Sequence, residues 1–191
     1  MSNTLNYHRI FIAIPIDNEL KSYIHQTARS IYPNYPALRW INQENYHITL
    51  HYLGSLSHTQ LENVSYKIKP IIEHYSSFSL KFETTSSFPS ARNPHSLVVL
   101  TKLSFLLNNL FEETKAAITA SGITLSSRAY TPHITIARIK AGAWLGNNKR
   151  LPSPLKIPVQ ELQLLQSLTE EETIKFKKLS VFKLTHHAVE V

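Results

Sequence analysis

The stretches His47-Ile48-Thr49-Leu50 and His133-Ile134-Thr135-Ile136 repeat one pattern, His-x-Thr-x with an apolar residue at each x. Side chains of a strand alternate between its two faces, so the histidine and the threonine of each stretch share one face and the apolar residues share the other. An apolar face buried in a core fixes the register of such a strand. The pattern therefore predicts two rigid strands, each presenting an imidazole beside a hydroxyl.

The two stretches occupy equivalent places in two similar halves of the chain. The interval from His8 to His47 is 39 residues, and the interval from His95 to His133 is 38 residues. Each interval has the pattern of a strand, a helix, a loop and a second strand. The simplest account is an α+β fold of two lobes related by a pseudo-twofold axis, with one His-x-Thr strand from each lobe in a shared cleft.

The hydrophobic pattern also predicts the individual elements. Strands are expected over 9–15, 46–53 (ending at Gly54), 78–83, 96–100, 133–137, 160–167 and 173–184. Two helices are expected after the N-caps Asp17 and Ser57 (with Gln60 completing a capping box), and a third helix is expected over 104–120. Residues 142–158 resemble a loop with room for a short helix, and residues 170–172 an acidic turn.

The composition excludes several kinds of site. The chain has no cysteine, which excludes disulfides, thiolate zinc sites and a cysteine nucleophile. Asp17 is the only aspartate, which argues against carboxylate-rich magnesium sites and against Asp-oriented triads. The four glycines form neither of the common phosphate-binding loop motifs.

Size and charge indicate the class of protein and of partner. The length of 191 residues and the 42% hydrophobic content suit a single bilobal domain over 1–191. The net charge of +7, with 20 Lys+Arg against 13 acids, favours an anionic partner such as nucleic acid. We find no membrane-spanning segment and no export signal, and expect a cytoplasmic protein.

Two imidazoles that face one cavity suit acid–base chemistry on a phosphate. In-line displacement at phosphorus places the attacking and leaving oxygens on opposite sides, which a twofold-related pair of histidines matches. One neutral histidine can take a proton from water while the other, as imidazolium, protonates the leaving oxygen. The threonine hydroxyls can donate to the non-bridging oxygens. This chemistry requires no metal and no cofactor.

The same residues also have plainer interpretations. A third His-x-Thr, His25-Gln26-Thr27, has a polar middle residue and lies in a predicted helix. His47 and His133 could each be structural histidines, but a matched pair in matched halves argues against this. His47 and His51 have the spacing of a helical zinc site, yet the context is a strand and lacks the HExxH glutamate. On a strand, His51 shares the face of His47, where it contacts substrate or lies at the cleft rim.

Other side chains have two open roles each. By strand parity Arg138 faces the core side, unless a bulge turns it toward phosphate. Arg128 and Tyr130 suit phosphate binding and base stacking, or simply the surface and the core. Trp40 is assigned to the core rather than to stacking. A solvated face, or a groove mouth that steers RNA, is expected for Lys175, Lys177, Lys178 and Lys183.

The residues 47–54, HITLHYLG, resemble the first signature of the two-histidine phosphoesterases, and 128–138, RAYTPHITIAR, resemble the second. The nearest branch is the RNA 2′,3′-cyclic phosphodiesterases, also called the 2′-5′ RNA ligase family. The opening 9–14 and Arg39-Trp40 are also typical of it, and the resemblance covers residues 8–185. The sequence departs from the family at 171–176, where a Gly and a Tyr are often found, and at Tyr52, where Phe is common.

The resemblance implies antiparallel sheets that form a central groove, with helices on the outside. It also implies metal-independent hydrolysis of RNA or nucleoside 2′,3′-cyclic phosphates to 2′-phosphates. In this family His47 is the proton donor to the 3′ oxygen and His133 the proton acceptor, and Thr49 and Thr135 would bind substrate. The expected partners are RNA ends, tRNA fragments among them, or cyclic nucleotides, with no membrane contact and a monomeric state.

Three other functions remain open at this point. The same four residues suit a 2′-5′ RNA ligase or a 2′-5′ oligonucleotide phosphodiesterase. A catalytically idle RNA-binding module is disfavoured because both histidines and both threonines are present. A small structural protein is disfavoured because there is no exposed amphipathic stripe or coiled-coil heptad.

Overall fold

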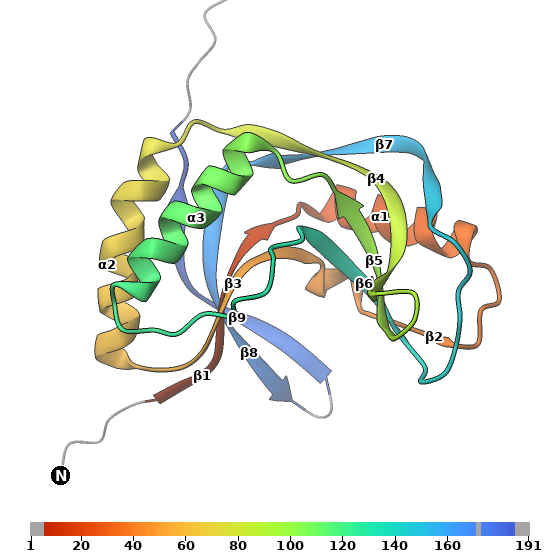
Figure 1. Ribbon diagram of the computed structural model, residues 1–191, viewed down its shortest axis with the longest axis horizontal. Coiled ribbons are helices and arrows are strands. Elements are labelled where there is room, and N and C mark those ends of the chain that lie inside the picture. The colour runs from red at the N-terminus through yellow and green to blue at the C-terminus, as the bar shows by residue number, and fades with distance from the viewer. Residues whose placement is uncertain (1–5, 171–172, 186–191) are drawn as a thin grey trace, which may run out of the picture.

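Strands dominate the computed structural model, which describes residues 6–170 and 173–185 (Figure 1). Within these ranges nine strands form one antiparallel sheet in the order β7-β4-β5-β6-β3-β1-β8-β9, with β2 paired to β6. The strands are β1 (Asn6–Pro15), β2 (Leu38–Trp40), β3 (His47–Ser57), β4 (Phe78–Pro89), β5 (Pro94–Thr101), β6 (His133–Ile139), β7 (Lys149–Val159), β8 (Glu161–Glu170) and β9 (Thr173–Lys183). The helices are α1 (Asn18–Ile31), α2 (His58–His74) and α3 (Phe105–Thr119), with a short 3₁₀ turn at Gln43–Asn45.

The strand pairing repeats itself about the centre of the sheet. β1 pairs with β3 so that Ile14 lies opposite Ile48, and β5 pairs with β6 so that Val99 lies opposite Ile134. β3 and β6 pair with each other only at Ile48 and Ile134, both fully buried. This single pair joins the two halves, which separate on either side of it. The expected α+β fold with a pseudo-twofold relation is confirmed, and the two expected sheets are joined into one.

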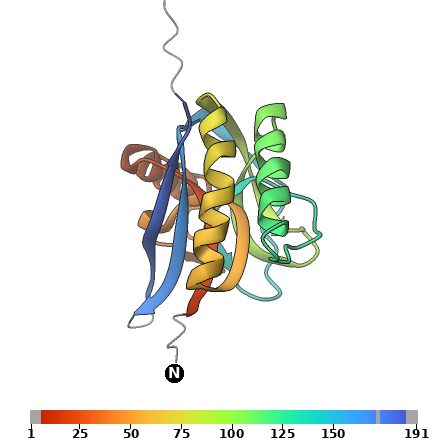
Figure 2. The ribbon, with the colours of Figure 1, turned by 90° about the vertical axis from the view of Figure 1, so that its left-hand side faces the viewer.

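Each half of the sheet is covered by a helix from the other half. α1, from the first half, packs against β7, whereas α3, from the second half, packs beside α2 and against β3. Figure 2 shows α2 and α3 side by side on the outside of the sheet. The helices were expected outside, but their exchange between halves was not predicted. None of the helices in the described ranges combines the length and apolarity that crossing a membrane requires.

The helix boundaries follow the capping residues. Asp17 accepts a hydrogen bond from Leu20 N at 2.8 Å, and Ser104 accepts one from Leu107 N at 3.2 Å. Ser57 and Gln60 form the reciprocal capping box, at 3.2 and 2.9 Å. Each bond satisfies a donor that the first helical turn leaves unpaired, so the three predicted N-termini are confirmed.

The prediction of a loop over 142–158 is wrong for its second part. Residues 149–159 form β7, although they contain Pro152, Pro154 and Pro158. β7 is an edge strand that pairs only with β4, so the amide hydrogens missing from proline are not all needed. β3 also continues past Gly54, whose φ of 77° a glycine adopts without strain, instead of ending there. Two residues of the predicted acidic turn, 171 and 172, lie outside the described residues.

Replacing Ile48 with alanine should strongly destabilise the fold, because it removes a buried side chain where the two halves meet. We expect a loss of about 2–5 kcal/mol in the free energy of unfolding, measured by urea denaturation. Ile174→Ala is the matched control, because that isoleucine is 45% exposed. It should cost no more than about 0.5 kcal/mol. Equal losses in the two variants would contradict the central role of the Ile48–Ile134 pair.

Candidate active site

The four residues of the paired motifs line one groove between the two halves of the sheet. His47 and Thr49 come from β3 and His133 and Thr135 from β6, and the groove has a volume of 390 Å³. Its other lining residues are Arg39, Trp40, Ile41, Asn42, Asn45, Arg138, Thr173, Ile174 and Phe176. Both histidines are half-buried. The structure thus brings together the two imidazoles and two hydroxyls that the sequence singled out.

Each histidine ring is held by the backbone two residues before it. His47 Nδ1 lies 2.8 Å from the carbonyl oxygen of Asn45, and His133 Nδ1 lies 2.7 Å from that of Thr131. A carbonyl oxygen only accepts hydrogen bonds, so Nδ1 carries the hydrogen in both rings. Nε2 of each neutral ring is therefore the nitrogen that can accept a proton.

Thr49 is directly coupled to His47. Its Oγ1 lies 3.0 Å from His47 Nε2, so the hydroxyl donates to the neutral ring. The Tyr130 hydroxyl donates to the backbone oxygen of Thr49 at 3.3 Å. Tyr130 thus ties the segment before β6 to the middle of β3.

Phenylalanine rings pack against both imidazoles. Phe11 and Phe176 lie 5.1 and 5.0 Å from the His47 ring, and Phe88 stacks on His133 at 4.3 Å. None of the three was predicted from the sequence. Phe11 lies in a strand whose two faces are both apolar, so the sequence does not show which face carries it toward the site. Phe176 does leave a signal, because it is an apolar residue between lysines.

This packing lowers the pKa of both histidines. Burial, as the largest cause, lowers the pKa of His47 to about 4, the hydrogen bond to Asn45 opposes the shift, and the charge of His133 adds to it. Burial also lowers the pKa of His133, against the effect of its hydrogen bond to Thr131. Both rings are therefore neutral at pH 7 in the free protein.

Equivalent bulges interrupt the two motif strands. The extra residue is Leu50 in β3 and Ile136 in β6, as the pairing of Ile12 with His51 and of Leu97 with Ala137 shows. A bulge shifts the alternation of faces by one residue.

The bulge in β6 turns Arg138 toward the groove. Arg138 lines the groove and donates from Nη1 to Ser96 Oγ at 2.8 Å. Of the two orientations open to Arg138, the structure shows the one that depends on a bulge.

The bulge in β3 turns His51 away from His47, so the prediction that they share a face is wrong. His51 is 4% exposed, its Nε2 lies 2.9 Å from Thr114 Oγ1, and its ring stacks on Phe111 at 4.6 Å. Burial, the largest cause, lowers its pKa to about 4. Tyr52 takes the outward position instead and is 59% exposed.

The remaining candidates divide between two sides of the motif strands. Arg128 and Tyr130 line a second hollow of 390 Å³, which shares Thr49 and His133 with the groove. Trp40 is half-buried and lines the groove, so it is not simply a core residue. The side chains of Lys175, Lys177, Lys178 and Lys183 on β9 are exposed.

In the ranges that the structure describes, no group of three or more histidine, aspartate or glutamate side chains is arranged to hold a metal ion.

Two His-x-Thr strands, placed in one antiparallel sheet about a pseudo-twofold axis, define the class of the two-histidine phosphoesterases. The family model for "LigT like Phosphoesterase" matches residues 14–98 and 103–188, and the chain belongs to this family. It is therefore an enzyme of the hydrolase class.

Individual relatives agree with this assignment. The RNA 2′,3′-cyclic phosphodiesterase of Bacillus subtilis is 30% identical over 184 residues, which cover 87% of this chain and 94% of that protein. The protein of the same name from Geobacillus stearothermophilus is 27% identical over 182 residues, 91% of this chain and 56% of that protein.

Solved structures show the same fold. Escherichia coli LigT, crystallised with 3′-AMP, superposes with a TM-score of 0.81 at 21% identity, over 94% of this chain and 99% of that chain. TT0787 of Thermus thermophilus gives a TM-score of 0.79 at 20% identity, over 92% of this chain and 97% of that chain.

His51 should make the fold sensitive to acid. The unfolded chain takes up a proton near the ordinary pKa of 6.5 and the folded chain only near 4, so stability present above pH 6.5 is lost as the pH falls toward 4. Between pH 7.5 and 5 this histidine should cost about 2 kcal/mol, or about 4–8 °C in Tm. The His51→Gln variant keeps a polar side chain opposite Thr114. It should lose correspondingly less stability between pH 7.5 and 5. The measurement is thermal melting of both proteins across this pH range. An identical decrease in Tm in the two proteins would contradict this role.

Proposed function

We propose that the protein hydrolyses 2′,3′-cyclic phosphates at RNA or nucleoside ends to 2′-phosphates. The observation that carries the proposal is the pair of imidazoles in one groove, each with Nδ1 bound to a backbone carbonyl. This leaves two Nε2 atoms for proton transfer, the number that one in-line hydrolysis needs. The names of the Bacillus and Geobacillus relatives support the choice of substrate.

His133 is the proposed base and His47 the proposed acid. Neutral His133 takes a proton from water through Nε2 as the water oxygen forms its bond to phosphorus. The bond between phosphorus and the 3′ oxygen breaks, and protonated His47 gives that oxygen its Nε2 proton. The products are a 2′-phosphate and a 3′-hydroxyl, and proton exchange with solvent restores the two rings.

Thr49 and Thr135 are proposed to bind the non-bridging oxygens. In the free protein the Thr49 hydroxyl donates to His47 Nε2 at 3.0 Å. Once His47 is protonated, Nε2 becomes a donor, so the Thr49 hydrogen is released to point at a phosphate oxygen. Arg39 and Arg138, which also line the groove, provide positive charge for the phosphodiester anion.

Protonation of His47 is proposed to accompany substrate binding. Its pKa of about 4 makes the ring a poor proton carrier in the free protein. A phosphodiester anion in the groove raises this pKa, because a negative charge nearby favours the imidazolium. The substrate thus generates the acid that cleaves it, and the side chains alone supply acid, base and charge.

Alanine at either histidine should abolish turnover without unfolding the protein. We expect His47→Ala and His133→Ala each to lose about 10²- to 10⁴-fold in kcat, the usual contribution of a general acid or base. The assay is hydrolysis of 2′,3′-cyclic AMP in excess EDTA, with ³¹P NMR to identify the phosphate isomer.

His58→Ala is the matched control, because that histidine is exposed on α2, outside the groove. Wild-type turnover in either active-site variant would overturn the assignment of the two histidines as acid and base. Activity that is lost in EDTA and restored by a divalent cation would overturn the metal-independent mechanism. Cleavage of 2′-5′ linkages without hydrolysis of cyclic phosphates would overturn the proposed choice of substrate.

The pH profiles should separate the free protein from the complex. The profile of kcat/KM reports the pKa values of the free protein, and that of kcat the values in the complex. Because burial lowers both histidine pKa values, the singly protonated free form declines as the pH rises, and kcat/KM should be highest below pH 6.5. The kcat profile should be displaced to higher pH by the bound anion. Coincident optima at or above pH 7 would contradict coupled protonation.

A further inference from the structure

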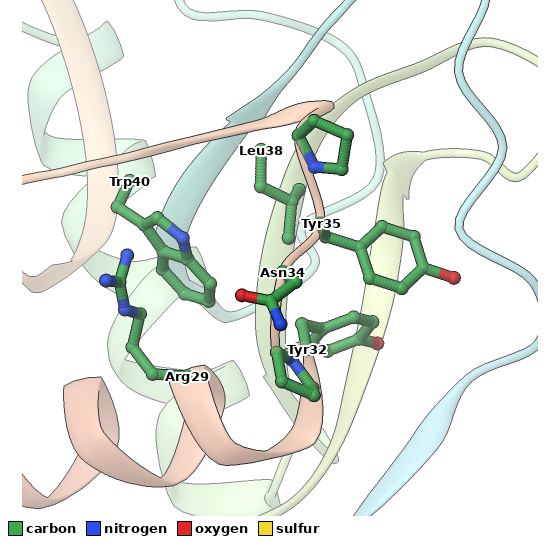
Figure 3. A pocket seen from close by; sticks show the side chains of 8 residues that line it. Arg29, Tyr32, Asn34, Tyr35, Leu38 and Trp40 are labelled. Atoms are coloured by element: carbon green, nitrogen blue, oxygen red, sulfur yellow. The ribbon is translucent and has the colours of Figure 1, made fainter.

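A second hollow, outside the candidate active site, lies between α1 and β2. It has a volume of 490 Å³ and is lined by Arg29 of α1, Trp40 and Leu38 of β2, and the connecting residues 32–36. Figure 3 shows the Asn34 amide in its centre, between Arg29 and Trp40 on one side and the rings of Tyr32 and Tyr35 on the other. We call it the β2 hollow. Its volume falls in the range of small-ligand sites, about 300–1,000 Å³.

The β2 hollow adjoins the groove of the two histidines at one residue. Trp40 lines both. A third hollow, on the other side of β2, shares Leu38 with the β2 hollow and Arg39 and Arg138 with the groove. A ligand that extends from the histidines along β2 therefore meets one of these two hollows next.

The charge along this path has one sign. Arg29, Arg39, Arg138 and Lys140 line the three hollows, and no aspartate or glutamate is among the described residues that line them. Lys149 adds a further cation, with Nζ 5.7 Å from the Tyr35 ring centre. Such a path attracts a chain of phosphates rather than a single anion.

The groups in the β2 hollow suit a nucleobase. The Arg29 guanidinium lies 5.2 Å from the Trp40 ring centre, and Tyr35 is 36% exposed. Single-stranded RNA sites combine aromatic and guanidinium planes, on which bases stack, with cations that bind the backbone. The amide of Asn34 offers both a donor and an acceptor to the edge of a base. Asn34 has a φ of 54°, a conformation that asparagine tolerates well.

The opposite hollow, beside Arg128, has some of its aromatic faces covered by other rings. Its Phe111 ring is covered on both sides, by Tyr130 at 4.2 Å and by His51 at 4.6 Å. Phe88, which also lines it, stacks on His133. Tyr52 also lines this hollow and is 59% exposed, and the cations of the hollow are Lys115 and Arg128.

We propose that the β2 hollow binds a nucleotide on the 5′ side of the cyclic phosphate, so that the enzyme favours single-stranded RNA ends over mononucleotides. The inference rests on the proposed function, because a cyclic phosphate at the histidines is the 3′ end of its strand. All other nucleotides then lie on the 5′ side and must leave the groove along one of its two sides. The four cations along β2, against Lys115 and Arg128 in the opposite hollow, favour the side of β2.

The test compares two substrates, 2′,3′-cyclic AMP and a pentaadenylate that ends in a 2′,3′-cyclic phosphate. Arg29→Ala and Tyr35→Ala should each lower kcat/KM on the pentamer by about 5- to 10-fold, mainly through KM, because stacking and phosphate contacts are lost. On the mononucleotide both variants should match the wild type. Lys69→Ala and Tyr66→Ala, at exposed positions of α2 away from the path, are the matched controls and should change neither value.

Two results would overturn the inference. One is an equal kcat/KM of Arg29→Ala, Tyr35→Ala and the wild type on the pentamer. The other is a selective loss on the pentamer in Arg128→Ala but not in Arg29→Ala, which would route the strand through the opposite hollow.

Failure of the proposed function gives a different result. In that case the wild type would hydrolyse neither substrate. The β2 hollow is then tested by fluorescence anisotropy with a labelled pentaadenylate that carries a 3′-phosphate. Weaker binding by Arg29→Ala and Tyr35→Ala supports the site, and unchanged binding overturns it.

Discussion

The pairing of Ile48 with Ile134 is the contact on which the rest of the site depends. It is the one place where β3 meets β6, and both side chains are fully buried. Neighbouring residues of a strand face opposite ways, so burying these isoleucines turns the flanking histidines and threonines to the other side. The antiparallel register directs His47 toward Thr135 and Thr49 toward His133. Because the strands pair no further, they separate and leave a groove. One apolar contact thus creates both the cavity and the alignment of the groups in it.

Burial that builds the site also opposes its chemistry. Phe11 and Phe176 against His47, and Phe88 against His133, fix the rings and lower their pKa values. A general base benefits, because it stays neutral, but a general acid needs its proton. The anionic substrate resolves this conflict in the proposed mechanism, since it stabilises one imidazolium only while bound. The same apolar surroundings strengthen each hydrogen bond to the phosphate. The rings are therefore part of the proposed catalytic environment, although they carry no reactive group.

The sequence predicted the features that depend on local pattern. The N-caps and the paired motifs follow from hydrogen-bonding and burial rules that act within a few residues. Prediction from the sequence failed where the structure of a segment depends on the strand that pairs with it. β7 was not recognised, because an edge strand tolerates prolines that a central strand would not. The bulges at Leu50 and Ile136 left no signal in the sequence, so the predicted orientation of His51 was wrong and that of Arg138 stayed open. The packing of the three phenylalanines on the histidines likewise depends on how β1, β4 and β9 are placed in space.

Two equivalent histidines do not by themselves distinguish acid from base, so the assignment of roles requires asymmetry. The segments that precede the two motifs provide it. Residues 32–46 add β2 to the edge of β6 and form an exposed hollow with Arg29 and Trp40. The corresponding residues 120–132 add no strand, and their Tyr130 stacks on Phe111 and bonds to Thr49. If RNA leaves along β2, its ribose has one orientation between the imidazoles, and the 3′ oxygen meets the same histidine in every turnover. The pseudo-twofold axis then supplies the pair of proton carriers, and the break in that symmetry decides which of them is the acid.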